Sequence, residues 1–347
     1  MRTLILNRPD DWHVHFRDQD ILPYTVIGTA THFARALVMP NLQPALTSAK
    51  AVKHYHQRIL HTLNQLNPKP DFTPYMTLYL NEQMPPQELE ELKQDSYILG
   101  AKLYPAGATT HSSEGCHSIQ ALYPLLEVLE HQNLVLQIHG EVTYGDIFAR
   151  EALFIETYLK PMVRAFPKLR IVLEHISTKA AVDYVTDAPE TVAATITPHH
   201  LLYNRNHMLV GGIKPHYYCM PILKKEDDQL AIQKAAVSGN PKFFAGTDSA
   251  PHAQLKKESA CGCAGIYSAP FALAIYTEVF AKCEKLDKLN DFMSRFGAQF
   301  YQLPITKNHI EMIEKEQKIP GCLPFGTDKV IPIAAGSTLA WSVHEPT

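Results

Sequence analysis

Histidines and one aspartate stand at the ends of several short apolar runs, and these residue types can hold metal ions. His13 and His15 are separated by one residue, and the two-residue period of a strand would point both imidazoles to the same side. They would then be close enough to bind one ion. His139 and His175 each end another apolar run and would supply neutral nitrogen donors to a second ion. The Asp248 carboxylate could bind metal and also move a proton.

Lys102 ends a further apolar run, within Gly100–Tyr104. A protonated lysine could not enter a site that holds cations. A desolvated amine that reacts with carbon dioxide would become a carbamate, whose two anionic oxygens suit the bridging of two zinc ions. The alternative is an ion pair with a neighbouring carboxylate, and the residue type alone favours that alternative.

The elements that must position these residues alternate along the chain. Short apolar runs typical of strands are separated by longer segments of helical period, which predicts a parallel sheet. Eight such runs indicate an α/β fold in which a single closed (β/α)8 TIM barrel carries the metal site at the carboxyl ends of its strands. The expected strands are Asp11–His15, Ala36–Pro40, Thr73–Leu80, Ile98–Tyr104, Leu134–His139, Arg170–His175, Val192–Pro198 and Phe243–Asp248. The expected helices are Ser48–Leu66, Pro86–Gln94, Ser118–His131, Ile147–Phe166, Lys179–Thr186, Lys225–Ser238, Pro270–Lys285 and Leu289–Phe300.

This alternation runs through nearly the whole sequence, with no internal repeat, low-complexity tract or linker. We therefore expect residues 1–347 to form one domain, with an irregular, proline-rich tail from about Ile319. Pro161 should end or kink the helix expected over Ile147–Phe166, because proline lacks a backbone N–H.

The composition limits the partners that the protein can have. The 347 residues are 46% hydrophobic, enough for one large core, and their net charge of −3 gives no positive field for nucleic acid. No apolar stretch approaches the roughly 18 residues of a membrane span, and no signal peptide is visible, so we expect a cytoplasmic protein without a membrane partner. The six scattered cysteines are typical of free thiols, and Cys261-Gly262-Cys263 is typical of a tight glycine turn rather than a zinc knuckle.

Longer motifs surround the reactive residues. They are Asp11-x-His13-x-His15-x-Arg17, Val38–Leu42, Ala101–Ala106, Thr197-Pro198, Asn204–Met208, Gly246–His252, Lys257–Ser259 and Cys261–Gly265. With these motifs, the sequence resembles the amidohydrolase superfamily and, more closely, bacterial dihydroorotases of the shorter, single-domain type. The resemblance covers nearly the whole chain, and its motifs are specific.

Carried over residue by residue, the resemblance implies a homodimer with two zinc ions in each subunit. The ligands implied are His13, His15, Lys102 and Asp248 for one ion, and Lys102, His139 and His175 for the other. Lys102 would be carboxylated and would bridge the two ions. Asp248 would also be the catalytic residue, taking a proton from the attacking water and passing it to the leaving ring nitrogen.

The resemblance also implies the substrate and the residues that bind it. The reaction would be the reversible, zinc-dependent cyclisation of N-carbamoyl-L-aspartate to L-dihydroorotate and water, in the de novo synthesis of the pyrimidine nucleotide UMP. The binding residues implied are Arg17, Asn41 and His252 for the side carboxylate, backbone groups near Met220 and Ala264 for the ring amides, His139 beside the substrate, and Thr109 and Thr110 in a mobile loop that covers the site.

The chain departs from the family pattern at two positions. Met220 stands in place of leucine, and a backbone contact would survive that change. His199 stands in place of glutamine, directly before His200. We do not expect His199 to bind metal, because adjacent residues of a strand point to opposite faces.

Two other kinds of protein remain open from the sequence. A different cyclic amidohydrolase, such as a hydantoinase or an allantoinase, would keep the metal ligands but need not keep Arg17, Asn41 and His252 together. A barrel without activity that serves only in assembly should have lost at least one ligand, and none is missing here.

Overall fold

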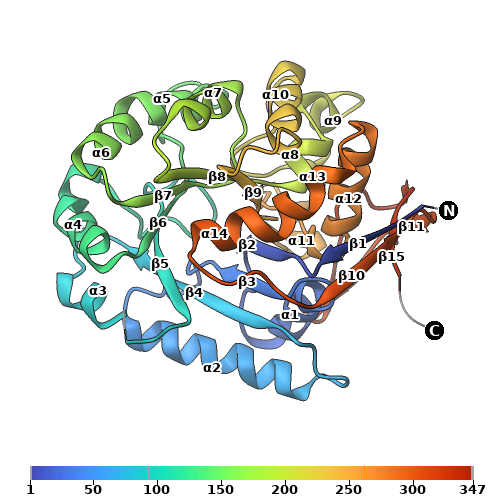
Figure 1. Ribbon diagram of the computed structural model, residues 1–347, viewed down its shortest axis with the longest axis horizontal. Coiled ribbons are helices and arrows are strands. Elements are labelled where there is room, and N and C mark those ends of the chain that lie inside the picture. The colour runs from blue at the N-terminus through green and yellow to red at the C-terminus, as the bar shows by residue number, and fades with distance from the viewer. Residues whose placement is uncertain (1, 93, 261, 345–347) are drawn as a thin grey trace.

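The computed structural model describes residues 2–92, 94–260 and 262–344. Its main sheet has eight parallel strands that follow one another in chain order, and helices surround the ring of strands (Figure 1). The strands are β2 (Asp10–Val14), β3 (Arg35–Val38), β4 (Thr73–Leu80), β5 (Ile98–Leu103), β6 (Val135–Ile138), β7 (Arg170–Leu173), β8 (Val192–Ile196) and β9 (Phe243–Ala245). All eight predicted strands are present.

Hydrogen bonds between the first strand and the segment directly after the last strand close the barrel. The Asp248 amide donates to the His13 carbonyl at 2.9 Å, and the His15 amide donates to the Ser249 carbonyl at 3.0 Å. The buried Asp11 carboxylate accepts hydrogen bonds from the amide and the hydroxyl of Thr247, at 2.8 and 2.6 Å. The closed sheet confirms the predicted (β/α)8 fold and brings His13 and Asp248 side by side.

Helices connect successive strands and pack their apolar faces on the outside of the barrel. They include α1 (Leu22–Ala30), α2 (Ala49–Gln65), α3 (Pro86–Leu92), α4 (Tyr123–Gln132), α5 (Arg150–Phe154), α6 (Lys160–Ala165), α7 (Lys179–Asp187), α10 (Glu226–Ala236) and α12 (Ala269–Lys282). Ser48 caps α2, because its side chain accepts from the Ala51 amide at 3.2 Å. The helix does not end at Pro161. A π-helical turn, Ile155–Leu159, joins α5 to α6 just before it.

The connection after β8 differs from the prediction. β8 ends at Ile196, and Pro198 begins the short helix α8 (Pro198–Leu202), which is followed by α9 (Arg205–Leu209). The Thr197 side chain caps α8 by accepting from the His200 amide at 3.1 Å. His199 and His200 therefore lie in a helix and not in a strand, so the strand argument applied to them was wrong.

Aromatic side chains fill the amino-terminal end of the barrel. α14 (Phe296–Phe300) lies in front of β2 in the view of Figure 1, and the Trp12 and Tyr301 rings stack with centroids 4.5 Å apart. Gly297 permits this approach, since a Cβ there would lie 2.0 Å from Trp12 Nε1. These rings cluster with apolar residues that point inward from the surrounding strands, including Phe244. This end of the barrel is closed by packing.

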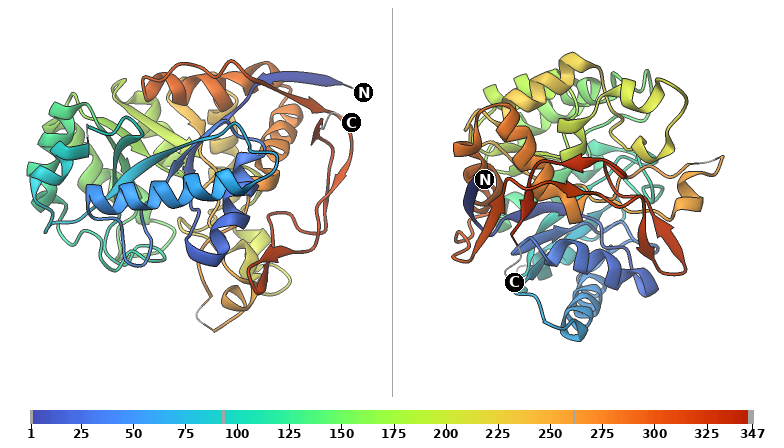
Figure 2. Two further views of the ribbon diagram at one scale, coloured as in Figure 1. Left: turned by 90° about the horizontal axis from the view of Figure 1, so that it is seen from below. Right: turned by 90° about the vertical axis from the view of Figure 1, so that its right-hand side faces the viewer.

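A second, small sheet joins the two ends of the described chain. β1 (Thr3–Asn7) pairs with β10 (His309–Ile313), which pairs with β15 (Ser342–Val343). The final segment was expected to be irregular, yet it contains short strands: β11 (Gln317–Lys318), β12 (Leu323–Phe325), β13 (Asp328–Val330) and β14 (Thr338–Leu339). It runs along one side of the barrel (Figure 2). Within the described residues, no helix is long and apolar enough to cross a membrane.

The cysteines in the described residues are free thiols, as expected. Gly262 has a φ of +52°, and its amide donates to the Ser259 carbonyl at 3.1 Å, which is consistent with a tight turn. Cys261 lies outside the described residues, so the Cys-Gly-Cys pair as a whole stays a prediction.

Candidate active site

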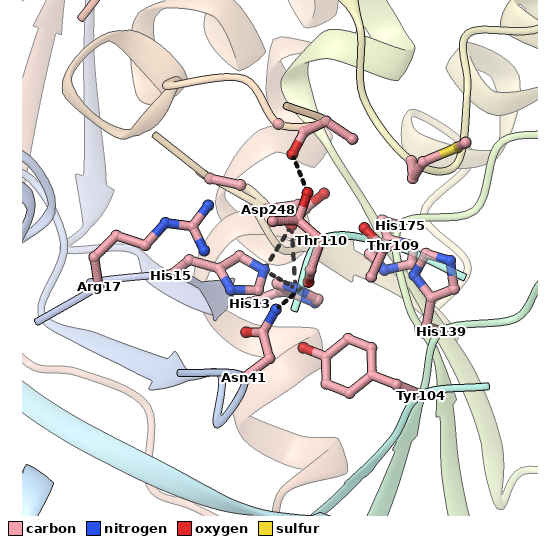
Figure 3. A pocket seen from close by; sticks show the side chains of 14 residues that line it. His13, His15, Arg17, Asn41, Tyr104, Thr109, Thr110, His139, His175 and Asp248 are labelled. Carbon is pink, nitrogen blue, oxygen red and sulfur yellow. Dashed lines mark hydrogen bonds and ion pairs between the residues drawn. The ribbon is translucent and has the colours of Figure 1, made fainter. Parts of the chain in front are cut away.

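The six residues predicted to bind metal lie together at the carboxyl ends of the barrel strands, and all of them are buried. Five of them line one cavity and are labelled in Figure 3. His13 lies in β2 and His15 directly follows it, Lys102 lies in β5, His139 follows β6, His175 follows β7, and Asp248 follows β9. The structure thus brings together side chains that are as much as 235 positions apart in the chain, because parallel strands end at the same face of the barrel.

The metal-binding atoms of His13, His15 and Asp248 lie close together. The Nε2 atoms of His13 and His15 are 3.2 Å apart, and Asp248 Oδ1 lies 3.2 Å from the former and 3.1 Å from the latter. Neighbouring ligand atoms of a tetrahedral zinc ion with bonds of about 2.0–2.1 Å are separated by roughly 3.3 Å. His13, His15 and Asp248 therefore fit one metal ion.

The charge on Asp248 is favoured in spite of its burial. Burial by itself raises the pKa of this carboxyl group, but His13 and His15 outweigh it and hold the pKa well below its usual range. The pKa of His13 falls to about 3, chiefly because burial disfavours the charged imidazole. An ionised carboxylate beside neutral imidazoles is the protonation state that metal binding requires.

Backbone strain marks the same site. His175 and Asp248 both have a φ of +43°, and Arg17 has a φ of +59°, although none of them is glycine. Such left-handed residues cost on the order of 1–3 kcal/mol each and are found mainly where function requires a special geometry. Here the turns aim the three side chains over the mouth of the barrel.

His139 and His175 form the second group of donors. Their ring centroids are 4.8 Å apart, and the ring of His13 lies 5.0 Å from that of His175. The Nδ1 atom of His175 is buried and has no hydrogen-bond partner. A buried imidazole nitrogen without a partner is unusual and would be satisfied by a metal ion.

The Lys102 amine lies at the second group, fully buried, and contacts the Glu174 carboxylate. Burial lowers the pKa of the amine well below its usual value, which favours the neutral form that reacts with carbon dioxide. The unmodified chain thus shows the contact between Lys102 and a neighbouring carboxylate that was considered as the alternative. Glu174 Oε1 has no partner, so this carboxylate is also free to face a cation.

Two glutamates of the site were missed in the sequence. Glu174 precedes His175 and ends the apolar run Ile171–Leu173, a position where a charged residue is itself a signal. Glu141 follows His139 by two residues, and its Oε2 lies 3.2 Å from His139 Nε2. Burial raises the pKa of Glu141, but His139 and Lys224 outweigh it and lower the pKa. A carboxylate on one imidazole nitrogen orients the other nitrogen toward a metal ion.

Most of the residues expected to bind substrate line the same cavity, whereas His252 does not line it but contacts Arg17 and Ala264, which do. Arg17, Asn41, Met220 and Ala264 line it together with Tyr104, whose side chain the sequence did not single out. Tyr104 lies two positions after Lys102, so the period of the strand could have revealed it. The cavity is small, about 20 Å³ in volume, which leaves room for about one water molecule.

The loop that carries Thr109 and Thr110 lies across the mouth of the cavity. The Thr110 hydroxyl donates to the Ala264 carbonyl at 3.3 Å, and the Asn41 amide group donates to the Thr110 carbonyl at 3.2 Å. Both threonines line the cavity. The loop thus bridges two of the expected binding residues.

Arg17 is a buried cation without a counter-ion. Its Nε donates to the Pro251 carbonyl at 3.0 Å, and its Nη2 lies 3.1 Å from His252 Nε2. Burial and then the Arg17 charge lower the pKa of His252 to about 2, so this imidazole is neutral. Among residues 2–92, 94–260 and 262–344, no carboxylate forms an ion pair with Arg17. A buried guanidinium is costly unless an anion compensates it, so the cavity is suited to a ligand with a carboxylate.

Comparison with known proteins agrees with this geometry. The sequence pattern of the "Amidohydrolase family" matches residues 4–314. A "Dihydroorotase" of Coxiella burnetii is 54% identical over 350 residues, covering 99% of both chains, and one of Nitrosococcus oceani is 51% identical over 346 residues, again covering 99% of both. The chain belongs to the amidohydrolase family and, within it, to the dihydroorotases.

Solved structures of this family share the fold closely. The dihydroorotase of Campylobacter jejuni has a TM-score of 0.90 at 34% identity, covering 99% of this chain and 98% of that one. A dihydroorotase of Saccharomyces cerevisiae in complex with 5-fluoroorotic acid has a TM-score of 0.88 at 33% identity and full coverage of both chains. An L-hydantoinase of Arthrobacter aurescens has a TM-score of 0.78 at 15% identity, covering 98% of this chain and 83% of that one, and so shares the fold alone.

Proposed function

We propose that this dihydroorotase closes N-carbamoyl-L-aspartate to L-dihydroorotate and water, reversibly, with two zinc ions in the cavity of Figure 3. The observation that carries this proposal is Arg17, a buried guanidinium that lines the same cavity as the metal ligands and has no carboxylate partner in the part of the chain that the structure describes. The substrate and the product each carry a carboxylate that Arg17 could bind through two parallel hydrogen bonds. The reaction belongs to the de novo synthesis of pyrimidine nucleotides.

The donor set supports zinc at two positions. His13, His15 and Asp248 would hold one ion, and His139 and His175 would hold the other, with Lys102 as a carbamate between them. Imidazole nitrogens and carboxylate oxygens are ordinary zinc ligands. When bound, zinc lowers the pKa of a coordinated water to about 7 and polarises a carbonyl oxygen.

The side chains themselves would bind, orient and move protons. Arg17, with Asn41 and His252 beside it, would fix the substrate's side carboxylate, while backbone groups near Met220 and Ala264 would bind the ring amides. Asp248 would accept a proton from the attacking water and deliver it to the leaving ring nitrogen, and ring closure would run these steps backwards. The Thr109 and Thr110 loop would exclude bulk water.

We also propose that the protein is a cytoplasmic homodimer and that residues 1–347 form one domain. The resemblance to single-domain bacterial dihydroorotases supports the homodimer and the single domain. The free cysteines at all five described positions support a cytoplasmic location, where thiols stay reduced. Sedimentation velocity of the purified chain would test the dimer.

The direction of the reaction tests the assignment. Ring closure converts a carboxylate into a neutral imide and takes up a proton, so the equilibrium ratio of dihydroorotate to carbamoyl aspartate should fall about tenfold for each unit rise in pH. The test is to equilibrate the metal-loaded enzyme from both directions at several pH values. Turnover of hydantoins without turnover of dihydroorotate, or a ratio independent of pH, would show that the assigned reaction is wrong.

A further inference from the structure

A second group of potential metal ligands lies outside the cavity, where α8 meets the segment after the 3-10 turn Pro215–Tyr217. His199 and His200 come from α8, and Cys219 comes from that segment. One ligand atom from each residue lies within 4.8 Å of the other two, and all three side chains are buried. Since 3.6 residues make a helical turn, adjacent positions of α8 lie only about 100° apart, and both rings can reach Cys219.

His199 has an unusual environment. Its side chain is 0% exposed, and neither ring nitrogen has a hydrogen-bond partner among the described residues. An unsatisfied buried polar group costs about 1–3 kcal/mol, so two on one ring indicate that a partner is absent from the protein itself. Burial lowers the pKa of His199 to about 4, which leaves a neutral imidazole with one free lone pair.

His200 and Cys219 are held in place beside it. The Nδ1 atom of His200 lies 2.8 Å from the Thr197 hydroxyl, and its Nε2 lies 3.1 Å from the Pro221 carbonyl. Whichever nitrogen turned to a metal ion, the other would remain anchored, which is the usual arrangement of a ligating histidine. The Cys219 thiol donates to the Pro221 carbonyl at 3.2 Å, so its sulfur is fixed near both rings.

We propose that His199, His200 and Cys219 form a third metal site, for a thiophilic divalent cation of the zinc class. Imidazole nitrogen and thiolate sulfur are both ordinary protein ligands of zinc. Binding would form a metal–sulfur bond and release the Cys219 thiol proton to solvent, without oxidation or reduction. None of the three residues lines the active-site cavity among the described residues, so this site is separate from the two zinc positions proposed above.

The position of the site gives it a consequence for the cavity. Met220, which follows Cys219, lines the active site. An ion bound to Cys219 would tie this segment to α8 and so hold the Met220 backbone at a fixed distance from β8.

Cobalt provides the test, because the proposed active site contains no sulfur ligand. The full-length protein, stripped with a chelator and titrated with Co²⁺, should bind three equivalents. The third should bring the near-ultraviolet charge-transfer band of a cobalt–thiolate bond. His199→Gln and Cys219→Ser should each lose the band and one equivalent, while keeping two equivalents.

Cysteine variants elsewhere serve as matched controls. Cys116→Ser, at another buried free thiol, and Cys263→Ser, near the cavity, should keep the band and all three equivalents. Binding of only two equivalents by the unsubstituted protein, a third equivalent without the thiolate band, or a band that survives Cys219→Ser would each overturn the third site. Loss of all three equivalents from both variants would also overturn it, since the site would then not be separate. None of these results bears on the proposed reaction, which the turnover assay tests independently.

Discussion

The two ends of the barrel are built from the same strands, yet they differ in whether their buried charged side chains have partners. At the amino end, Arg35 donates to both oxygens of Asp10 and to the Pro304 carbonyl, and its guanidinium lies 5.7 Å from the Trp12 ring. At the carboxyl end, Arg17 is equally buried but has no carboxylate partner. One buried arginine is compensated by the fold, and the other would be compensated by a ligand.

Two buried lysines show the same contrast. Lys242, directly before β9, donates to the carbonyls of Thr186 and Ala188 and is thereby satisfied by the backbone. Lys102 lies among histidines, Asp248 and the partly unpaired Glu174. For these two pairs of side chains, incomplete pairing, rather than burial as such, distinguishes the functional site from the structural core.

The largest effect should come from the lysine pair. Lys102→Ala should lower kcat by about 10³-fold or more and reduce the bound zinc toward one equivalent, because two close cations repel without anionic oxygens between them. Acetate or propionate should restore part of the activity by supplying such an oxygen. Lys242→Ala should instead cost about 1–3 kcal/mol of unfolding free energy and leave kcat and zinc content unchanged. Metal analysis, turnover with and without added acid, and urea unfolding measure these differences.

Two results would contradict the predictions for Lys102 and Lys242. Full zinc occupancy and near-normal kcat in Lys102→Ala would exclude the carbamate, and the contact with Glu174 would then be the whole function of Lys102. Rescue of Lys242→Ala by propionate would remove the contrast between the two ends.

The arginine pair should separate binding from stability. Arg17→Met should raise KM for dihydroorotate about 100-fold with zinc retained, because the carboxylate loses its charged partner. Arg35→Met should leave KM unchanged but lower the free energy of unfolding by about 3–5 kcal/mol, since Asp10 would stay buried without its partner. Steady-state kinetics and denaturant unfolding of both variants check this. An unchanged KM for Arg17→Met would show that Arg17 does not bind the substrate carboxylate.

The loop should have a smaller effect. The double variant Thr109→Val/Thr110→Val should lower kcat about tenfold while zinc content stays at the unsubstituted level, because the lost hydroxyls close the lid and bind no metal. Thr277→Val removes a hydroxyl that bonds within α12 and serves as the matched control. Zinc loss in proportion to activity would show that the loop is structural.

The last expected effect concerns stability rather than activity, and it depends on pH through the buried Glu151. Burial raises the pKa of this carboxyl group from 4.5 to about 7, although Lys224 and Thr178 oppose the shift. Below about pH 4.5, Glu151 is protonated in both the folded and the unfolded chain, and the free energy of unfolding is not reduced by this group. As the pH rises from 4.5 through 7, the free energy of unfolding should fall by up to about 3 kcal/mol, because the unfolded chain loses the Glu151 proton more readily than the folded chain. Glu151→Gln should remove this loss.

Urea unfolding at pH 5 and pH 8 measures the effect of Glu151. The difference in unfolding free energy between the two pH values should be smaller in Glu151→Gln than in the unsubstituted protein. The Gln side chain can still accept from the Ser177 amide, which Glu151 does at 2.9 Å, so folding should persist. Identical pH dependence in both proteins would contradict the raised pKa.

The sequence predicted the barrel, and it also predicted that the six proposed metal ligands lie at one end of the barrel, because both depend on local patterns. Each strand is a short apolar run, and each ligand ends one, so position along the chain translates directly into position at the mouth of the barrel. The Thr197-Pro198 pair was a visible helix-start signal as well. Because this signal was not used, His199 and His200 were treated as strand residues, although they lie in a helix.

Features that depend on distant parts of the chain could not be predicted. The pairing of β1 with β10 has no local signature, since Thr3–Asn7 is a strand only because His309–Ile313 lies beside it. The left-handed φ angles of Arg17, His175 and Asp248 arise from the closure of the barrel and not from residue type. The approach of Glu174 to Lys102 likewise appears only once β5 and β7 are placed in the ring.

The small sheet that joins β1 to β10 imposes an order on synthesis. Arg2 and Glu314, which pair across it, are 312 positions apart, so the ribosome must make nearly the whole chain before β1 has its partner. Until then, the first strand made is an exposed edge that other chains could pair with. Such long-range pairing slows folding, and cells that make this protein quickly should depend on chaperones to protect that edge.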